Sequence, residues 1–266
     1  MFKFSWLTDI HLDHLSESDA YTFLESVQRD SSERVIITGD ISHSHELPKH
    51  LKMIDEIVQK PTYFVLGNHD FWGSSVAHIN EHLPAVVNST LYLKWMSVQG
   101  VVPLDRETCI IGHEGWYDCR NGDPQNSPFR MVDWQAMLDY RGIGTMGEII
   151  TRSQSLAQGG YDYLKKQISE AVRRFSKVIV LTHFPPFADS HVYNGKIGEP
   201  YAQPFYTNKQ LGDLLLSAAN AFPKVGFTVF AGHTHGRISK QYGHNLAVHV
   251  GGAEYGRPKI QDIVSV

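Results

Sequence analysis

Five short stretches of the sequence place Asp, Asn or His directly after an apolar run. In chain order they are Asp9-x-His11, Gly39-Asp40, Gly67-Asn68-His69-Asp70, His183 and Gly232-His233-x-His235. Carboxylate, amide and imidazole groups bind divalent metal ions, and His also transfers protons. Asp9-x-His11, Gly39-Asp40 and His183 taken singly are typical of turns or structural positions, whereas the other two stretches each place several coordinating groups within a few residues. All five at the ends of apolar runs favour a single metal site.

The apolar runs themselves are short and rich in β-branched and aromatic residues, which is typical of buried strands. The expected strands cover residues 2–7, 35–38, 63–66, 178–181, 227–230 and 246–250, and helical spacing is found over residues 19–28 and 47–58. The resulting β-α-β-α-β order predicts a partly parallel sheet with helices packed against it. Ligands bind at the carboxyl ends of the strands in such sheets, so we expect the five stretches to meet there.

Taken together and in order, the five stretches resemble the motifs of the calcineurin-like metallophosphoesterase superfamily, and they extend from Asp9 to His235. The resemblance implies an α/β fold, a four-layer α/β/β/α sandwich of two mixed sheets, formed by residues 1–266 as a single domain. Residues 113–160 are rich in turn-forming residues and have no clear period, so we expect a cap or insertion there. Within it, residues 113–116 (His-Glu-Gly-Trp) are the best candidate for a specificity loop.

The resemblance also implies two metal ions with Asp40 as a shared ligand. The first ion would be held by Asp9, His11, Asp40 and His235, and the second by Asp40, Asn68, His183 and His233. Oxygen and imidazole donors without a thiolate suit Mn, Fe, Zn, Co or Ni. An extended chain would turn His233 and His235 to the same side, and Gly232 and Gly236 would let the backbone turn sharply around them.

The reaction implied by the resemblance is dinuclear metal-dependent hydrolysis of a phosphoester. A hydroxide that bridges the ions would attack phosphorus in line. His69 would stabilise the transition state or protonate the leaving oxygen, and Asp70 would orient the His69 ring. Asn68 is neutral, so it leaves the centre with a net positive charge that attracts a phosphoryl anion.

The expected substrate is a small phosphomonoester, phosphodiester or nucleotide; a phosphoprotein phosphatase and a non-catalytic scaffold of the same fold are the alternatives. The chain of 266 residues has a formal net charge of -4, so it has no general basic field that would indicate nucleic-acid binding. Its amino terminus has no apolar stretch of signal-peptide length and no membrane segment is expected. With only two cysteines, which we expect to be reduced, the predicted location is the cytoplasm. The oligomeric state is left open.

Overall fold

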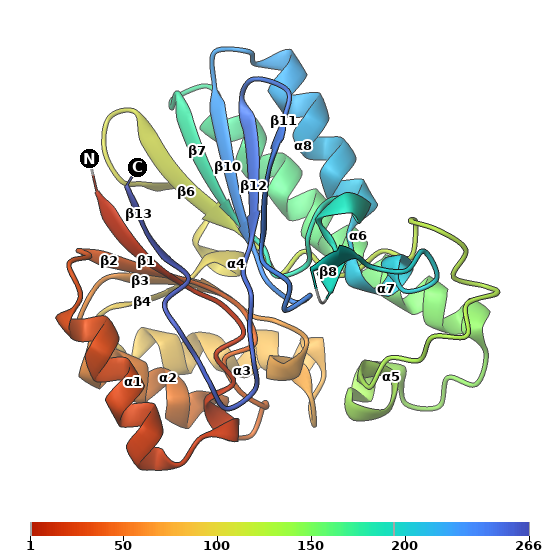
Figure 1. Cartoon of the computed structure of the whole chain (residues 1–266), viewed down its shortest axis with the longest axis horizontal. Coiled ribbons are helices and arrows are strands. Elements are labelled where there is room, and N and C mark those ends of the chain that lie inside the picture. Colours follow the sequence, from red (N-terminus) through yellow and green to blue (C-terminus); the bar gives the residue numbers. More distant parts are fainter. Residues whose placement is uncertain (1, 194, 266) are drawn as a thin grey trace.

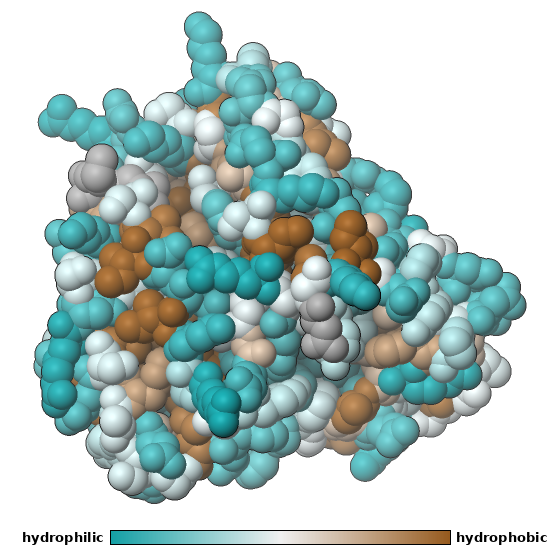
Figure 2. All heavy atoms as spheres, in the orientation of Figure 1, coloured by the Kyte–Doolittle hydropathy of each residue, from teal (hydrophilic) through white to brown (hydrophobic). Residues whose placement is uncertain are grey.

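Two mixed β-sheets pack face to face, with helices on both outer faces, in the computed structural model of the chain (Figure 1). The structure describes residues 2–193 and 195–265. The order of layers is α/β/β/α, which confirms the predicted fold class. On the face seen in Figure 2 the surface is mostly hydrophilic, and apolar side chains lie in small separate groups.

The first sheet has the order β13-β1-β2-β3-β4. Its strands are β13 (Asp262–Ser265), β1 (Lys3–Leu7), β2 (Arg34–Thr38), β3 (Thr62–Val65) and β4 (Leu93–Trp95). Neighbouring strands from β1 to β4 are parallel, and β13 is antiparallel to β1. The connecting helices are α1 (Glu17–Arg29), α2 (Leu47–Val58) and α3 (Val76–Asn88). The predicted β-α-β-α-β opening is therefore confirmed.

The second sheet has the order β11-β12-β10-β7-β6-β5 and is parallel from β12 to β6. Its strands are β11 (Ile238–Tyr242), β12 (Leu246–Val250), β10 (Gly226–Ala231), β7 (Lys177–Leu181), β6 (Thr108–Gly112) and β5 (Val102–Pro103). Helices α6 (Met146–Ala171) and α8 (Lys209–Ala221) pack on its outer face (Figure 1).

Short elements complete the chain. They are the 3-10 helices η1 (Leu12–His14), η2 (His69–Phe71), η3 (Leu138–Tyr140) and η4 (Ala188–Ser190), the helices α4 (Met96–Gln99), α5 (Asp133–Ala136) and α7 (Gln203–Tyr206), and the hairpin of β8 (Val192–Tyr193) and β9 (Lys196–Ile197).

The two sheets are joined by a layer of apolar side chains from both inner faces. Trp6 of β1 and Phe230 of β10 meet edge to face, with ring centroids 5.0 Å apart. Ile36 and Val65 from the first sheet and Ile179 from the second belong to the same buried cluster. Removal of this apolar area from water holds the sheets together, and it brings the carboxyl ends of β1, β2 and β3 close to those of β7 and β10.

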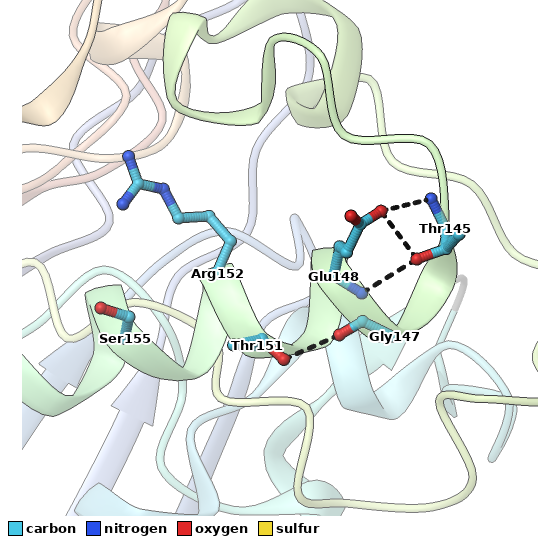
Figure 3. Close-up of a pocket in the computed structure, with 6 residues that line it drawn as sticks. All are labelled: Thr145, Gly147, Glu148, Thr151, Arg152 and Ser155. Atoms are coloured by element: carbon cyan, nitrogen blue, oxygen red, sulfur yellow. Dashed lines mark hydrogen bonds between the residues drawn. The ribbon is translucent and has the colours of Figure 1, made fainter.

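Helix α6 corrects the expectation of an irregular segment up to residue 160. It begins at Met146 and, at 26 residues, it is one continuous helix. Thr145 and Glu148 form a capping box at its start, where Thr145 Oγ1 accepts from the Glu148 N–H and the Glu148 carboxylate accepts from the Thr145 N–H (Figure 3). Glycines such as Gly159 and Gly160 have low helix propensity and obscured the pattern. No helix in residues 2–193 or 195–265 is long and apolar enough to cross a membrane.

Candidate metal centre

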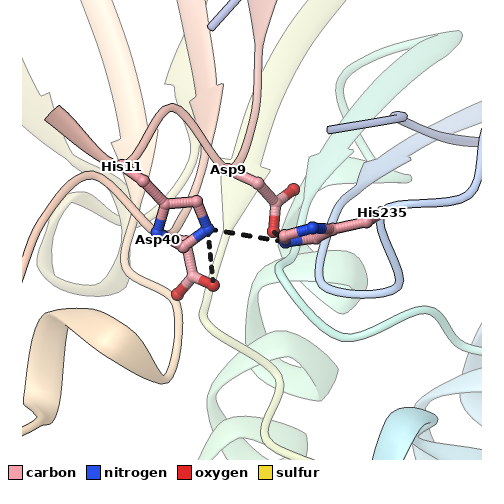
Figure 4. Close-up of side chains that lie close together, drawn as sticks. All are labelled: Asp9, His11, Asp40 and His235. Atoms are coloured by element: carbon pink, nitrogen blue, oxygen red, sulfur yellow. Dashed lines mark hydrogen bonds and ion pairs between the residues drawn. The ribbon is translucent and has the colours of Figure 1, made fainter. Parts of the chain in front are cut away.

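Four predicted ligands form a first cluster where the two sheets meet. His11 Nε2 lies 3.4 Å from His235 Nε2 and 3.8 Å from Asp40 Oδ2, and His235 Nε2 lies 3.5 Å from Asp9 Oδ1. Figure 4 shows His235 entering from the side opposite His11 and Asp40, so that the polar atoms face one another. One ligand atom from each side chain falls within 4.8 Å of all the others.

A second cluster shares Asp40 with the first. His183 Nε2 lies 3.5 Å from Asp40 Oδ2, and Asn68 Oδ1 lies 3.1 Å from His183 Nε2 and 2.9 Å from His233 Nδ1. Asp40, His183 and His233 again form a group with spacing suited to one ion. The structure thus brings all seven predicted ligands together in the predicted two groups, while metal binding by them stays a prediction.

The hydrogen bonds of His183 select the tautomer that a metal ligand needs. Its Nδ1 lies 2.8 Å from the carbonyl oxygen of Thr38. Because a carbonyl can only accept, Nδ1 carries a proton, and Nε2, which faces Asp40 and Asn68, is the nitrogen that would bind a metal ion in place of its own proton. A backbone carbonyl behind a ligand histidine is a common way to fix its ring in metal sites.

The donor set and its charges fit cations. The side chains of Asp9 and Asp40 are almost fully buried, and the charged groups that face them are imidazoles. Burial by itself would raise the pKa of Asp40, but His183 and His69 hold that pKa well below its usual value. Burial would likewise lower the pKa of His183, but the Asp40 carboxylate raises it to about 9. A proton therefore balances the buried carboxylates here, and divalent cations would do so through the same atoms.

Left-handed backbone positions most of the ligands. Positive φ angles occur at five of the seven predicted ligands: Asp9 (48°), His11 (38°), Asp40 (52°), His233 (69°) and His235 (56°). Asp and His tolerate this conformation better than most residues. The expectation that an extended chain turns His233 and His235 to one side is therefore wrong, because each reaches the site through its own left-handed turn.

Two glycines allow the loops to approach closely. A Cβ on Gly67 would lie 2.2 Å from Asp40 Oδ1, and a Cβ on Gly232 would lie 2.4 Å from Asp9 Oδ2. The expected sharp turn is present after Gly232, where the Thr234 N–H donates to the Gly232 carbonyl at 2.8 Å around His233, although neither Gly232 nor Gly236 has a positive φ itself. The lack of a side chain at Gly67 and Gly232 leaves room for the carboxylates of Asp40 and Asp9.

Asp70 has a different partner from the expected one. Its Oδ1 accepts from the backbone N–H groups of Ile41 and Ser42 at 2.9 and 2.8 Å, and its Oδ2 accepts from Gly67 N–H at 2.8 Å. The prediction that it orients the His69 ring is therefore wrong. Asp70 instead ties the loop after β2 to the loop after β3, and so positions Asp40 and Asn68.

The ring of His69 is held by stacking. It lies on Trp72, with ring centroids 3.6 Å apart, and its Nε2 lies 3.9 Å from Asp40 Oδ2 and 3.5 Å from the Tyr255 hydroxyl. Burial lowers the pKa of His69 to about 4, so the ring is neutral at pH 7. A neutral imidazole can still donate one hydrogen bond from Nε2 into the site.

A cavity of about 340 Å³ opens onto the clusters. It is lined by Asp40, Asn68, His69, His233 and His235, by residues 129–133, and by Trp72, Tyr193, Tyr206 and Tyr255. Sequence reasoning missed the last four and Asp133. Tyr193, Tyr206, Tyr255 and Asp133 carry no local motif and reach the site only through the fold, whereas Trp72 stands two residues after Asp70 and its place beside the motif was a usable signal. The hollow at the start of α6 in Figure 3 shares none of these residues and contains no predicted ligand.

The proposed specificity loop at residues 113–116 lies elsewhere. The Glu114 carboxylate is buried and accepts from Leu66 N–H, Trp95 Nε1 and Ser97 Oγ. Trp116 is buried in the core between Phe71 and Phe184. These residues therefore support the fold behind the site, and the part of the 113–160 segment that lines the cavity is residues 129–133.

Residues 2–237 match the calcineurin-like phosphoesterase family, so the chain belongs to this family. The ligand clusters thus stand at the positions that the resemblance in sequence assigned to metal ions. No curated protein sequence matches the chain significantly.

Solved structures share the fold at low sequence identity. Phosphopantetheinyl hydrolase from Mycobacterium tuberculosis superposes with a TM-score of 0.62 at 14% identity, covering 94% of this chain and 89% of its own. A dimetal phosphatase from Danio rerio superposes with a TM-score of 0.59 at 13% identity, covering 94% of this chain and 87% of its own. GAP50, described as the anchor in the inner membrane complex of Plasmodium, superposes with a TM-score of 0.51 at 15% identity. The match covers 94% of this chain and 71% of GAP50. Similarity at this level of identity is evidence for the fold alone.

Proposed function

We propose that the chain is a dinuclear metal-dependent phosphoesterase that hydrolyses small phosphoesters. The observation that carries this proposal is the pair of ligand clusters that share Asp40, with His69 beside them at the bottom of a cavity. A non-catalytic scaffold has no need for seven ligand-type side chains in contact or for a ring clamped beside them. We further propose that residues 1–266 act as one domain, with residues 129–133 capping the site, and that the protein works in the cytoplasm.

Two divalent ions, when bound, supply Lewis acidity to phosphoryl oxygens and lower the pKa of a coordinated water. The chain contributes orientation and proton control. Asp40 and Asn68 would keep their oxygens on the ions, and the Thr38 carbonyl would hold the ring of His183. His69, neutral and stacked on Trp72, would donate from Nε2 to the leaving oxygen as negative charge develops on it.

The cavity supports a small organic substrate with a ring. A second cavity of about 680 Å³ adjoins the first and shares Phe129, Tyr193 and Tyr206 with it. Aromatic walls favour stacking with a flat group, and Lys196 lines the second cavity as a cation. Volumes of this order are typical of small-molecule sites. We propose that the phosphoryl group sits at the clusters and that an aryl or nucleoside leaving group lies against these rings.

The test is metal-dependent hydrolysis by chelated and Mn-reconstituted protein. Its panel contains an aryl phosphomonoester, an aryl phosphodiester, nucleotides and a phosphopeptide. The proposal expects turnover with Mn, and His69→Ala should retain its metal while kcat falls by about 10²–10⁴-fold. Protein that binds two ions but cleaves none of the panel would contradict a phosphoesterase. Exclusive cleavage of the phosphopeptide would favour a phosphoprotein phosphatase instead.

The leaving-group site has its own test. Tyr193→Ala should raise KM for the preferred nucleotide or aryl ester with little change for a small alkyl phosphate, because it removes only the ring contact. Tyr21→Ala removes another exposed tyrosine, on α1 and outside both cavities, and serves as the control. Equal effects of Tyr193→Ala on aryl and alkyl esters would refute the proposed stacking.

A further inference from the structure

A third group of ligand-type side chains lies beside the two clusters already described. Asp13 and His14 come from η1, and His43 comes from the loop between β2 and α2. Asp13 Oδ2 lies 3.4 Å from His43 Nε2 and 3.8 Å from His14 Nε2, and the three ligand atoms fall within 4.8 Å of one another. None of these residues belongs to the seven predicted ligands.

Two atoms of this group are buried without a hydrogen-bond partner. The Asp13 side chain is only 4% exposed, and its Oδ1 has no partner among the described residues. The Nε2 of His43 is also buried and makes no hydrogen bond, although it lies 3.4 Å from the carboxylate. Unpaired buried polar atoms are costly. Within the described part of the chain, His43 Nε2 therefore lacks a partner on the side where it faces Asp13 Oδ2, and the carboxylate has an unused oxygen, Oδ1, beside the one that faces the ring.

The chemistry of the group indicates that this partner is a cation. Among the described residues, the ion pairs of Asp13 are with His14 and His43, and both rings are neutral when they ligate a metal. An anion would be repelled by the buried carboxylate. Ligand atoms around tetrahedral Zn²⁺ lie about 3.3–3.5 Å apart, given the usual bond lengths, which matches the separation of Asp13 and His43. His14 is 40% exposed and leaves a route for the ion and for a water ligand.

We propose that Asp13, His14 and His43 form a third divalent-cation site of the Asp-His-His type, suited to Zn²⁺. The site adjoins the dinuclear site without sharing ligands with it. The His14 ring lies 5.7 Å from the His11 ring, and the His43 ring lies 5.7 Å from the His69 ring. A cation there would add positive charge next to His11 and His69. Its binding does not depend on the proposed activity.

The test is the number of Zn²⁺ ions bound per chain. Tag-free, chelated full-length protein is titrated with Zn²⁺ by calorimetry, desalted and measured by elemental analysis. The double variant His14→Gln/His43→Gln should bind one ion fewer than the wild type. The control His45→Gln/His78→Gln also removes two imidazoles, from exposed positions outside the group, and should bind as many ions as the wild type.

Asp13→Asn is a milder variant in case the double variant unfolds. It should weaken Zn²⁺ binding at the proposed third site at least 10-fold, because it removes the only carboxylate of the three ligands. Asp40→Asn separates this proposal from the dinuclear one, because it should impair the shared site while the ion at Asp13 remains. Anomalous scattering at the zinc edge should place that ion on Asp13 and His43. Equal Zn²⁺ stoichiometry and affinity in the wild type, the double variant and Asp13→Asn would overturn the proposal.

Discussion

The side-chain amide of Asn68 donates a hydrogen bond from Nδ2 to Asp133 Oδ1 at 2.8 Å. This contact assigns the two ends of the amide, because it leaves Oδ1 of Asn68 to face His183 and His233. Trp72 Nε1 donates to the same oxygen of Asp133 at 2.7 Å. One buried carboxylate therefore orients both a predicted metal ligand and the indole on which His69 stacks.

Removal of Asp133 should weaken the metal centre without touching a ligand. Asp133→Ala leaves two buried donors unpaired, so we expect a loss of stability of about 2–4 kcal/mol and a 10–100-fold loss of affinity for the second ion. Calorimetric metal titration and urea unfolding measure the two effects. Asp139→Ala is the control, since Asp139 pairs with Val76 N–H and Arg152 outside the site and should lose stability alone. Unchanged metal affinity in Asp133→Ala would contradict a positioning role.

The neutrality of Asn68 can be tested separately from its hydrogen bond. Asn68→Asp places a carboxylate against Asp133 and should destabilise the metal-free protein by about 1–3 kcal/mol. The pair Asn68→Asp/Asp133→Asn restores a donor and an acceptor, so it should recover part of this stability. Both variants should still bind phosphate more weakly than the wild type, because the ligand carboxylate cancels positive charge at the centre. Phosphate inhibition that returns to the wild-type value in the double variant would refute the charge argument.

Gly67→Ala should disturb the centre through Asp40. The added Cβ would meet Asp40 Oδ1 at 2.2 Å and His183 Cε1 at 2.6 Å, so the ligands of both clusters must move. We expect a loss of stability of about 2–4 kcal/mol, at the upper end for a single substitution, and loss of the second metal ion. Gly144→Ala is the matched control, because its Cβ meets nothing within 4 Å. Thermal unfolding and metal content together check the prediction, and full metal content in Gly67→Ala would contradict it.

Two adjacent glycines of α6 should respond in opposite directions. The Cβ of Gly159→Ala meets nothing within 4 Å, so this change should stabilise the protein by about 0.5–1 kcal/mol through helix propensity. The Cβ of Gly160→Ala would lie 2.8 Å from His113 Nδ1 and should destabilise it by about 1–3 kcal/mol. Urea unfolding of both variants provides the comparison. Stabilisation by both changes would mean that α6 does not pack against His113 as closely as described.

Asp30 should make stability depend on pH. Its carboxylate accepts from Ser32 N–H at 2.7 Å, from Lys60 Nζ at 2.9 Å and from Ser5 Oγ. Burial opposes the charged form, but these hydrogen bonds lower the pKa of Asp30 below its usual value of 3.8. Because the pKa of Asp30 is lower in the folded state, its ionised carboxylate contributes fully to the free energy of unfolding above the unfolded-state pKa. This contribution is lost as pH falls through the folded-state pKa.

Asp30→Asn should therefore cost about 1–3 kcal/mol at pH 7, and the difference from the wild type should shrink below about pH 4. Urea unfolding between about pH 3 and 7, the range in which carboxylates titrate, measures this difference in stability at each pH. Asp213→Asn removes an exposed partner of Lys209 and should change stability by less than about 0.5 kcal/mol at every pH. A difference for Asp30→Asn that is the same at both ends of the range would contradict the assignment.

The positions of the main strands along the chain and the candidate ligands that follow them were predictable because both are local in the sequence. Apolar runs such as that of β3 have the length and composition of buried strands, and Asn68, His69 and Asp70 follow directly. That these stretches meet followed from their places at strand ends, but the assignment of His183 and His233 to one ion with Asp40, more than 140 residues away, followed only from the family resemblance. Helix α6 was missed because its glycines lower the local helix propensity. Packing against the rest of the protein stabilises the helix despite this low propensity.

The sequence by itself predicted which side chains form the candidate metal centre and which strand each one follows. The tertiary structure alone decided how they are held: that Asp70 accepts from backbone N–H groups of two loops, that Asp133 orients Asn68, and that Tyr255 lies beside His69. The physical reason is the range of the interactions. Strand propensity and apolar patterning act over a few neighbouring residues, whereas these hydrogen bonds and ring contacts join residues that become neighbours only after the two sheets have packed.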